Sequence, residues 1–485
     1  MRCCGGRIRR WTRTLVVMKK RYRLCLLFVT SIILWTAIAL SGLFRLSGPV
    51  DLLRRELRIF ADRIFAAVYI ADEQTLRHIT DNYFVGNRSL RYSSSIDSWK
   101  DVERQIPGFR ILGESGRPVT MYDIPFVYEK IDTPYLVSLR EHYSLGSIVK
   151  DAAGEYDAML RLGAWVGSRW DHGSDPPPGG VDVCNPIEVI QAGKTGARFW
   201  CEIAARLMVH AASALGWPAR LVTASRDGYT WEHAVAELWS NEYKKWFVID
   251  TDFNVVYEVD GEPLSAFELC HQGLELQRSG LLQTRYIAPS KPSLGYIDLM
   301  PYYNYVHIDM RNDWCSRPLA SGSPVGGDLS TWWTSRPSLG RMLTAQRRVD
   351  DPVLFNWAVN WVSIYALSAK RVSESLISIE IGLAGYSPTF KAFYISFDGG
   401  AWHEVEQPGY VLSAGAGEHI VRARLLTTSG YPGPISELSF HISSTCDKSR
   451  YPEKLRTPPT AGNLGADKFS SHDFGPGNEC CRGTL

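Results

Sequence analysis

Residues 195–254 read TGARFWCEIAARLMVHAASALGWPARLVTASRDGYTWEHAVAELWSNEYKKWFVIDTDFN, and this stretch decides the fold of the chain. From Cys201 onward, apolar residues recur at the spacing of one helix face, at Ile203, Ala204, Leu207, Met208, Ala211 and Leu215. Gly216 and Pro218 end the helix, because glycine accepts a C-cap conformation and proline cannot continue a helix. The pattern therefore predicts a helix from Cys201 to Leu215, with the cysteine in its first turn.

Two strand-like runs, HAVAELW and KKWFVID, follow this helix and are joined by a four-residue loop at 240–243. Their composition and spacing predict a β-hairpin. A register that pairs Trp239 with Lys244 places His233 directly opposite Asp250, with Cβ atoms roughly 4.5–5.5 Å apart. A slip of one residue would break this arrangement. The hairpin therefore predicts a close pair of His233 and Asp250.

Cys201, His233 and Asp250 together form a candidate nucleophilic site. The positive end of a helix dipole and its free N–H groups favour a thiolate at Cys201 and can hold a developing oxyanion. A histidine can deprotonate such a thiol, and a carboxylate can fix the histidine tautomer and stabilise the imidazolium. A lone cysteine on an apolar helix is usually a buried small hydrophobe. The catalytic interpretation therefore depends on the three residues together.

Other polar residues of the stretch allow alternatives. Asp252 shares the strand face of Asp250 and is a rival for the third role, but it lies beyond the end of the hairpin, which favours Asp250. Glu237 shares the face of His233 and is interpreted as a packing or substrate-side group. Arg220 is expected in a buried ion pair.

These residues resemble the transglutaminase-like superfamily of papain-like cysteine enzymes over roughly residues 150–260. The family pattern is a cysteine that opens a helix, a small-Gly-aromatic-Pro-Ala-Arg segment, His-Ala on a strand, and an aspartate on the next strand. The matching pieces are Cys201-Glu202, LGWPAR at 215–220, His233-Ala234 and VID at 248–250. The sequence departs from the pattern at Val235, where an aromatic residue is frequent, and at Thr251, where a proline is frequent.

The resemblance implies an α+β, papain/transglutaminase-like core in which the nucleophile helix packs on an antiparallel sheet. It implies a cysteine hydrolase or acyltransferase with a catalytic triad of Cys201, His233 and Asp250, and no cofactor or metal ion. Two features that the sequence lacks argue against two branches of the superfamily. The peptide N-glycanase branch carries CxxC pairs, which this chain lacks, and the arylamine acetyltransferase branch has Arg-Gly-Gly where Arg198, Phe199 and Trp200 precede Cys201.

The N-terminus predicts a membrane anchor. Residues 1–23 contain nine basic and no acidic residues, and residues 24–44 contain no charge. An uncharged run of this length can cross the hydrocarbon core as a helix, and the basic side stays in the cytoplasm. We therefore expect a single-pass signal anchor with the rest of the chain periplasmic or extracellular. A signal peptide cleaved near Ala39-Leu40-Ser41 is the alternative.

Composition excludes other classes of protein. The formal net charge of +2 gives no reason to expect a nucleic-acid partner. The ten cysteines include no CxxC pair, which argues against a structural zinc site. In an oxidising compartment Cys270 and Cys315 could form a disulfide.

Turn signals and changes in composition divide the chain into segments. Residues 350–443 hold alternating apolar strands and an Asp398-Gly399-Gly400 turn, which predict an immunoglobulin-like or fibronectin-like β-sandwich. Short runs at 126–128 and 135–139 are typical of strands, and the segment around 264–276 is typical of a helix. The predicted segments are a basic cytoplasmic segment (1–23), a signal anchor (24–44), a stalk and accessory β-rich region (45–148), the catalytic core (149–285), an aromatic-rich connecting region (286–349), the sandwich (350–444) and a disordered tail (445–485).

The sequence as a whole favours a membrane-anchored, extracytoplasmic cysteine enzyme that acts on amide bonds through an acyl-enzyme. Its substrate is expected to be a protein or peptide, or a cell-envelope polymer, and the acyl group would pass to water or to an amine. The alternative is a non-catalytic, membrane-anchored scaffold with the same fold. Tyrosines at 302–305 could line a cleft or belong to the core.

Overall fold

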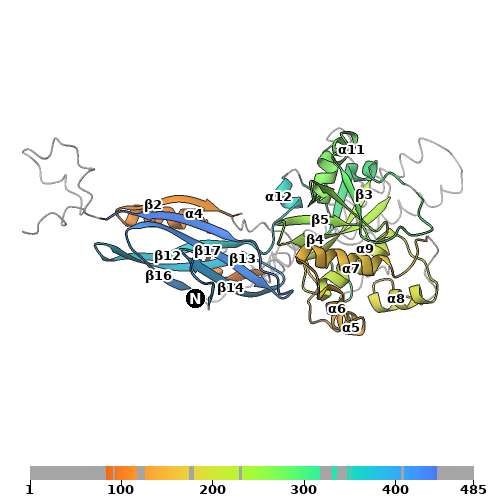
Figure 1. Cartoon of the computed structure of the whole chain (residues 1–485), viewed down its shortest axis with the longest axis horizontal. Coiled ribbons are helices and arrows are strands. Elements are labelled where there is room, and N and C mark those ends of the chain that lie inside the picture. The colour runs from red at the N-terminus through yellow and green to blue at the C-terminus, as the bar shows by residue number, and fades with distance from the viewer. Residues whose placement is uncertain are drawn as a thin grey trace, which may run out of the picture.

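The computed structural model describes residues 83–90, 93–116, 126–173, 180–228, 232–295, 297–316, 330–335, 347–349, 351–405 and 409–444. The predicted cytoplasmic segment at 1–23, the predicted signal anchor at 24–44 and the predicted tail at 445–485 lie outside these residues. Among the helices of the described ranges, none has the length and apolar character needed to cross a membrane. Figure 1 shows two parts side by side, a mixed α/β core and a set of long β-strands.

The core is built on one mixed sheet. In the described part of the chain its strand order is β11-β10-β9-β3-β4-β5. Neighbouring strands are antiparallel except for the parallel pair β10 and β11. The strands are β3 (Ala219–Ser225), β4 (His233–Ser240), β5 (Lys245–Ile249), β9 (Tyr305–Asp309), β10 (Ser330–Trp333) and β11 (Arg347–Arg348). The interior strands β3 and β4 are buried along their whole length, so the sheet is covered on both faces there.

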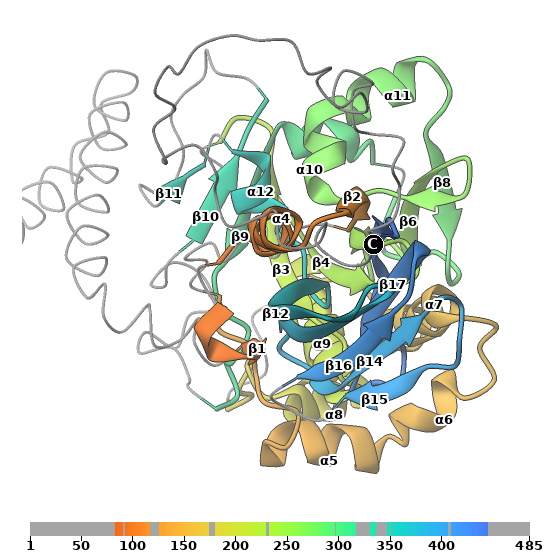
Figure 2. The same cartoon turned by 90° about the vertical axis from the view of Figure 1, so that its left-hand side faces the viewer.

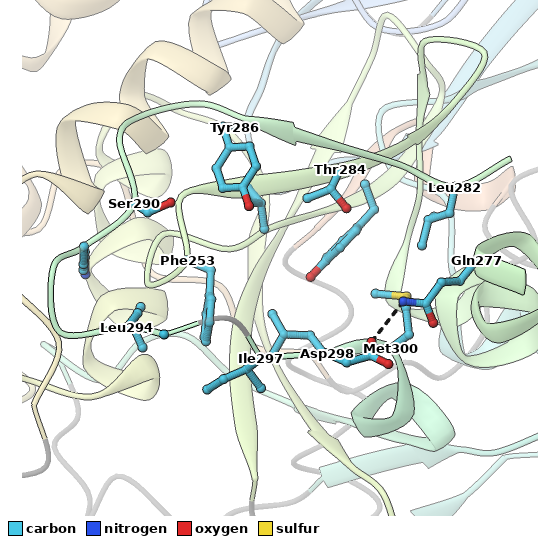
Figure 3. A pocket seen from close by; sticks show the side chains of 15 residues that line it. Phe253, Gln277, Leu282, Thr284, Tyr286, Ser290, Leu294, Ile297, Asp298 and Met300 are labelled. Carbon is cyan, nitrogen blue, oxygen red and sulfur yellow. Dashed lines mark hydrogen bonds between the residues drawn. The ribbon is translucent and has the colours of Figure 1, made fainter. Parts of the chain in front are cut away.

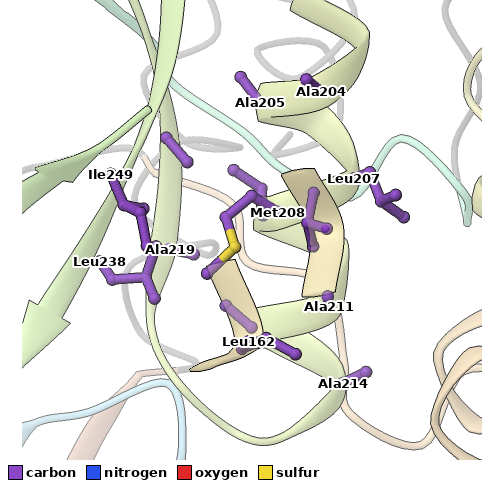
Figure 4. Packing of buried hydrophobic residues seen from close by; sticks show 14 of the residues in the cluster. Leu162, Ala204, Ala205, Leu207, Met208, Ala211, Ala214, Ala219, Leu238 and Ile249 are labelled. Atoms are coloured by element: carbon purple, nitrogen blue, oxygen red, sulfur yellow. The ribbon is translucent and has the colours of Figure 1, made fainter. Parts of the chain in front are cut away.

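Helix α9 (Cys201–Ala214) covers one face of this sheet and packs against α7 (Glu155–Gly167). Small residues at Ala204, Ala211 and Ala214 let the helix lie close to its neighbours. Figure 4 shows Met208 reaching from α9 toward the strands. Its neighbours in the cluster are Leu162, Ala219, Leu238 and Ile249, all fully buried. Burial of each large apolar side chain contributes about 1.5–3 kcal/mol. This packing holds α9, and with it Cys201 at the start of the helix, against the sheet.

The hairpin of β4 and β5 has a different register from the predicted one. Trp239 pairs with Trp246 and not with Lys244, so the predicted register is wrong by two residues. The two indole rings pack edge to face with centroids 5.8 Å apart, and Lys244 instead occupies the loop with a φ of 59°. A shift of two residues keeps every side chain on its face, so the pairing of His233 with Asp250 survives as a diagonal contact.

Short helices flank α7 and α9. They are α5 (Pro134–His142), α6 (Leu145–Val149) and α8 (Pro186–Lys194). The predicted strand at 135–139 is wrong: Pro134 opens a helix, and Leu136 and Leu139 are buried three residues apart. The predicted strand at 126–128 is reduced to a single bridge between Val127 and Arg311. The N-terminal cap of α8 at Asn185, which bonds the N–H of Ile187, stabilises the segment that leads to Cys201.

A small sheet of β7, β6 and β8 follows the core hairpin. Its strands are β6 (Val255–Val259), β7 (Glu262–Pro263) and β8 (Gln283–Tyr286). The helix predicted around 264–276 forms as three consecutive turns, α10 (Ala266–Glu268), the π-helical η2 (Leu269–Gly273) and α11 (Leu274–Arg278). The 3₁₀ turn η3 (Met300–Asn304) then leads into β9.

The β-rich part consists of two sheets that share one apolar cluster. One sheet holds β1 (Phe84–Gly86), β12 (Val362–Ser373), β13 (Leu376–Tyr386) and β16 (Tyr410–Ala414). The other holds β2 (Phe109–Ser115), β14 (Phe390–Phe397), β15 (His403–Val405), β17 (Gly417–Thr427) and β18 (Ser436–Ile442). Figure 2 views the molecule from the side of these strands.

Residues from before the core contribute to this β-rich part. β2 pairs with β18, and α4 (Ser95–Gln105) buries Trp99, whose indole donates a hydrogen bond of 2.8 Å to the carbonyl of Ile364. The 3₁₀ turn η1 (Arg88–Leu90) joins β1 to this segment. The predicted sandwich begins at residue 350, whereas β1, α4 and β2 come from residues 84–115. In the sequence, the residues of the core thus lie between two segments that both belong to the β-rich part.

The two parts meet at α12 (Pro352–Phe355) and the segment that follows it. The indole of Trp246 donates a 2.6 Å hydrogen bond to the carbonyl of Trp357, and the guanidinium of Arg220 lies 4.5 Å from the Trp357 ring. Gly216 approaches Thr428 closely at another point, so a Cβ added there would lie 2.6 Å from its hydroxyl oxygen.

Candidate functional site

Cys201 is the first residue of α9, as the sequence predicts. Trp200 is the N-cap residue and has an extended backbone. The Cys201 side chain is half-buried, and the following Glu202 pairs with Arg206 one turn along at 3.0 Å. The thiol therefore sits at the start of a helix in which the N–H groups of Ile203 and Ala204 donate to the Trp200 carbonyl, which leaves those of Cys201 and Glu202 without a partner in the helix.

His233 opens β4 and is held by Asp250. Its Nε2 lies 2.7 Å from Oδ2 of Asp250, and both side chains are buried. The other carboxylate oxygen of Asp250 accepts hydrogen bonds of 3.0 Å from the backbone N–H groups of Asp252 and Phe253. Phe253 also packs its ring edge to face with the imidazole, at 5.4 Å between centroids. The imidazole is therefore fixed in position and in orientation.

The three predicted site residues interact with one another. Burial alone would lower the pKa of His233, but the charge and hydrogen bond of Asp250 and a hydrogen bond to Cys201 outweigh burial and raise this pKa well above its usual value. Because Nε2 is committed to Asp250, Nδ1 is the ring nitrogen left for Cys201. The raised pKa of His233 favours an imidazolium beside the Cys201 side chain.

Asp252, the rival for the third role, has other partners. Its Oδ2 lies 2.7 Å from Nδ1 of His172, and its Oδ1 lies 3.2 Å from the ammonium of Lys291. Burial would raise the pKa of Asp252, but the hydrogen bond to His172 and the charge of Lys291 outweigh it and lower this pKa. The carboxylate is therefore ionised and belongs to a second His–Asp pair.

The sequence patterns do not identify His172 or Lys291 as site residues. His172 follows the helix α7 in an irregular segment, and Lys291 lies after β8, so neither falls in a recognisable motif. The one signal in the sequence is the repetition of aspartate at positions 250 and 252. The structure places Asp250 at the end of β5 and Asp252 in the turn that follows, and each carboxylate holds its own basic partner.

Glu237 and Arg220 form a fully buried ion pair between β3 and β4. Nε of Arg220 lies 2.7 Å from Glu237, whose second oxygen accepts a 2.6 Å hydrogen bond from the N–H of Ala266. This confirms the buried pair expected for Arg220 and places Glu237 in packing. Among the tyrosines at 302–305, Tyr303 and Tyr305 are buried, whereas the half-buried Tyr302 lies 6.4 Å from the His233 ring.

A cavity of about 440 Å³ adjoins the site on the side of Phe253. Figure 3 shows Phe253, Leu294 and Ile297 along its wall and the hydrogen bond of 3.0 Å between Gln277 and Asp298. Lys291 also lines this cavity. The cavity is therefore connected to the site through Phe253, which packs on His233, and through Lys291, which pairs with Asp252. Its volume falls in the range of small-molecule pockets.

The other described cysteines, Cys184, Cys270 and Cys315, are buried free thiols. Sγ of Cys270 donates to the carbonyl of Asn304, whereas Sγ of Cys315 contacts the carbonyl of Cys184 at 3.3 Å and His210 at 3.5 Å. The disulfide considered between Cys270 and Cys315 is absent: both are free thiols, and each has its own hydrogen-bond partners. Within the described ranges, no three His, Cys, Asp or Glu side chains group closely enough to hold a metal ion.

Two comparisons with known proteins bear on this site. No curated protein matches the chain in sequence. The family model of the transglutaminase-like superfamily matches residues 145–251, a range that includes α7, α9 and the β4–β5 hairpin together with Cys201, His233 and Asp250. Members of this superfamily are generally cysteine-dependent enzymes. Residues 145–251 are therefore a domain that matches the transglutaminase-like superfamily.

Proposed function

We propose that this protein is a cysteine enzyme that acts on amide bonds of a protein, a peptide or a cell-envelope polymer. The observation that carries the proposal is the arrangement of His233, with one ring nitrogen 2.7 Å from Asp250 and the other left for Cys201. A buried imidazole held between a carboxylate and a thiol has the composition of a nucleophile, base and orienting group.

In the proposed acylation step, the thiolate of Cys201 attacks the carbonyl carbon of the amide. The free N–H groups at the start of α9 stabilise the oxyanion that forms. His233 gives its proton to the leaving amine, so that the C–N bond breaks and a thioester on Cys201 remains. Asp250 keeps the imidazole oriented during this transfer.

In the second step, the thioester passes its acyl group to water or to an amine. Transfer to water makes the protein a protease or amidase, and transfer to an amine makes it an acyltransferase. The partly exposed thiol supports either outcome, because the acceptor must reach the thioester from solvent.

A search for turnover tests the proposal. The full chain is incubated with peptide pools in the presence and absence of a small primary amine, and new amine termini or amine adducts are detected by mass spectrometry. Cys201→Ala should abolish both products, and Cys270→Ala is the matched control because Cys270 lies in another cluster. Products that persist in Cys201→Ala would contradict the assignment. Binding of a partner without any turnover would favour the scaffold alternative.

We propose further that residues 24–44 anchor the protein in a membrane, with the core on the periplasmic or extracellular side. The support is the uncharged run itself and the basic segment before it. Protease added to intact cells should degrade an extracellular core, and protease added after the outer membrane is permeabilised should degrade a periplasmic core. A core that stays intact after permeabilisation would contradict this topology.

We also propose that the β-rich part is an immunoglobulin-like sandwich that acts as a spacer or partner-binding module. Two antiparallel sheets that share one apolar cluster support this proposal.

A further inference from the structure

The cavity beside Phe253 is built on one face of the small sheet. Its floor consists of four side chains that β6 and β8 present to the same side, namely Val255, Tyr257, Thr284 and Tyr286. They share a face because each of the two residues from β6 is the cross-strand partner of one of the two from β8. Leu294 and Ile297, from the chain after β8, lie across the cavity from this floor in Figure 3. The strand register therefore fixes the shape of the cavity.

The lining of this cavity is mainly apolar, and three of its residues are aromatic. The ring of Tyr257 is buried and that of Phe253 is half-buried, whereas Tyr286 is 63% exposed. The face of an aromatic ring is partly negative and attracts a cation that lies within about 6 Å of its centre. The long side chains of lysine and arginine pack their apolar stems on such surfaces and carry a charge at the end. The lining therefore favours a ligand of this kind.

The charges around the cavity do not cancel. Among the described residues, two charged ones line it, Lys291 and Asp298. Lys291 is 5% exposed, and its ammonium pairs with Asp252 at 3.2 Å. Arg285, the basic residue of β8, points to the opposite face of the strand and pairs with Glu258 at 3.3 Å. Within the described ranges, no basic side chain forms an ion pair with Asp298. These groups therefore leave one negative charge, on Asp298, without a counter-charge.

The carboxylate of Asp298 is held with one oxygen left for a ligand. Its Oδ1 accepts hydrogen bonds of 3.0 Å from the side-chain amide of Gln277 (Figure 3) and of 3.2 Å from the N–H of Met300. The part of the chain that the structure describes provides no hydrogen bond to its Oδ2. Burial raises the pKa of Tyr257 well above its ordinary value, and the charges of Asp250 and Asp298 raise it further. The charge of Asp298 thus acts on the aromatic interior of the cavity.

One turn joins this cavity to the catalytic pair. Asp250 and Val255 exchange two backbone hydrogen bonds, of 2.9 and 3.0 Å, where the chain turns from β5 into β6. Phe253 lies in this turn, packs its ring on the imidazole of His233 with centroids 5.4 Å apart, and also lines the cavity. A ligand in the cavity therefore rests on the segment that positions His233.

The strand β8 offers an edge to a further strand. In the described part of the chain β6 is its one hydrogen-bonded neighbour, so β8 forms an edge of its sheet. All four residues of β8 are exposed. An exposed edge strand can pair with an extended peptide, whose successive side chains point to alternate faces. Every second side chain of such a peptide would point to the face that carries the cavity.

We propose that the cavity is a recognition site for a basic residue of an extended peptide. The peptide pairs with the edge of β8 and places a lysine or arginine side chain among Phe253, Tyr257 and Tyr286, with its charge at Asp298. The inference rests on the proposed function for the role of this peptide as substrate, because it names the residue that selects the chain to be acted on. The binding step itself needs no turnover.

Binding is therefore measured without catalysis, on the full chain carrying Cys201→Ala. The probes are short fluorescein-labelled peptides that differ only at the central position, which holds arginine, citrulline, lysine, norleucine or glutamate. Citrulline and norleucine keep the stem of arginine and lysine but carry no charge. Asp298→Asn is the informative variant, because its amide oxygen can still accept both hydrogen bonds that Oδ1 accepts. Asp398→Asn is the matched control, because Asp398 is an exposed carboxylate of the β-rich part.

Fluorescence anisotropy should show that the arginine and lysine peptides bind about tenfold more tightly than their uncharged counterparts. The glutamate peptide should bind most weakly. This preference should be lost in Asp298→Asn, kept in Asp398→Asn, and reduced in Tyr286→Leu, which keeps an apolar side chain but removes a ring. N-methylation of alternate peptide nitrogens should weaken binding about tenfold in one of the two phases, because it removes the N–H groups that pair with β8.

Equal affinities for the arginine and citrulline peptides, or no binding of either, would contradict this inference and leave the proposed enzymatic function standing. A preference that persists in Asp298→Asn would place the cation elsewhere and contradict the assigned cavity. Binding that N-methylation in either phase leaves unchanged would contradict the pairing with β8. Conversely, selective binding of basic peptides by a parent protein that turns over none of them would support the recognition site and count against the proposed function.

Discussion

Asp250 lies diagonally across the β4–β5 hairpin from His233, yet its carboxylate reaches the imidazole at 2.7 Å. The pairing of the strands ends at Ile249, and Asp250 turns back to bridge Val255. This turn aims one carboxylate oxygen at His233 and the other at two backbone N–H groups. The chemistry of the site therefore depends on where the hairpin ends as much as on its register.

Replacing Asp250 by asparagine should reverse the hydrogen bond to His233. The amide nitrogen would donate to Nε2, so the neutral imidazole would carry its proton on Nδ1 and could not accept one from Cys201. We expect turnover to fall by about 10⁴-fold, as when the aspartate of a serine-protease triad is changed to asparagine. Steady-state kinetics measure this loss.

Asp398→Asn is the control for Asp250→Asn, because Asp398 also pairs with a histidine, His419, but in the β-rich part. It should retain most of the activity. Full activity in Asp250→Asn would remove the aspartate from the mechanism.

The raised pKa of His233 predicts a pH dependence of stability. The folded protein binds this proton more tightly than the unfolded chain, whose histidine has the ordinary value of 6.5. The stabilisation is therefore fully present below about pH 6.5 and is lost as the pH rises through the raised pKa. Urea unfolding of the parent and of His233→Gln from acidic to alkaline pH should show a difference that is largest at low pH. A difference that grows with rising pH would contradict the sign of this effect.

The buried pair of Arg220 and Glu237 should matter much more than a similar exposed pair. Arg220 and Glu237 face each other across β3 and β4 with no exposed surface, while Arg422 and Glu437 face each other across β17 and β18 and are about one-third exposed. Glu237→Gln leaves a buried guanidinium without a counter-charge and should cost about 3–5 kcal/mol. Glu437→Gln should cost at most about 1 kcal/mol. Chemical denaturation measures both, and equal losses would contradict the role of burial.

Gly216 should not tolerate a side chain. Its φ is 81°, and an added Cβ would lie 2.9 Å from the backbone nitrogen of Ser429 in the β-rich part. Gly280 has a similar φ of 74° but nothing within 4 Å, so Gly280→Ala measures conformational strain alone, about 1–2 kcal/mol. Gly216→Ala should lower the melting temperature further than Gly280→Ala does. Equal shifts would mean that the contact between the two parts contributes nothing.

The sequence predicted the local elements of the site well, and for a physical reason. The helix from Cys201 and the two strands after it are encoded by periodicity and end signals over neighbouring residues. Cys201, His233 and Asp250 all lie on these elements, so their meeting could be predicted. The register was wrong because the sequence alone does not show that Trp239 and Trp246 prefer to pack together.

Contacts between distant segments could not be predicted from local patterns. The partners of Asp252 come from residues 172 and 291, and β2 pairs with a strand more than 300 residues later in the chain. At 135–139, the short apolar run predicts a strand, but the buried Leu136 and Leu139 lie three residues apart on a helix. These features depend on tertiary packing, which a single sequence does not display.

The most direct test of the central claim is the reactivity of Cys201 toward iodoacetamide as a function of pH, followed by mass spectrometry of its peptide. An imidazolium–thiolate pair predicts rapid labelling well below the free-thiol pKa of about 8.5, and loss of this reactivity in His233→Ala. The buried Cys184, Cys270 and Cys315 provide internal controls in the same sample. Slow labelling of Cys201 that rises only near pH 8.5 and is unchanged in His233→Ala would contradict an activated nucleophile in this protein.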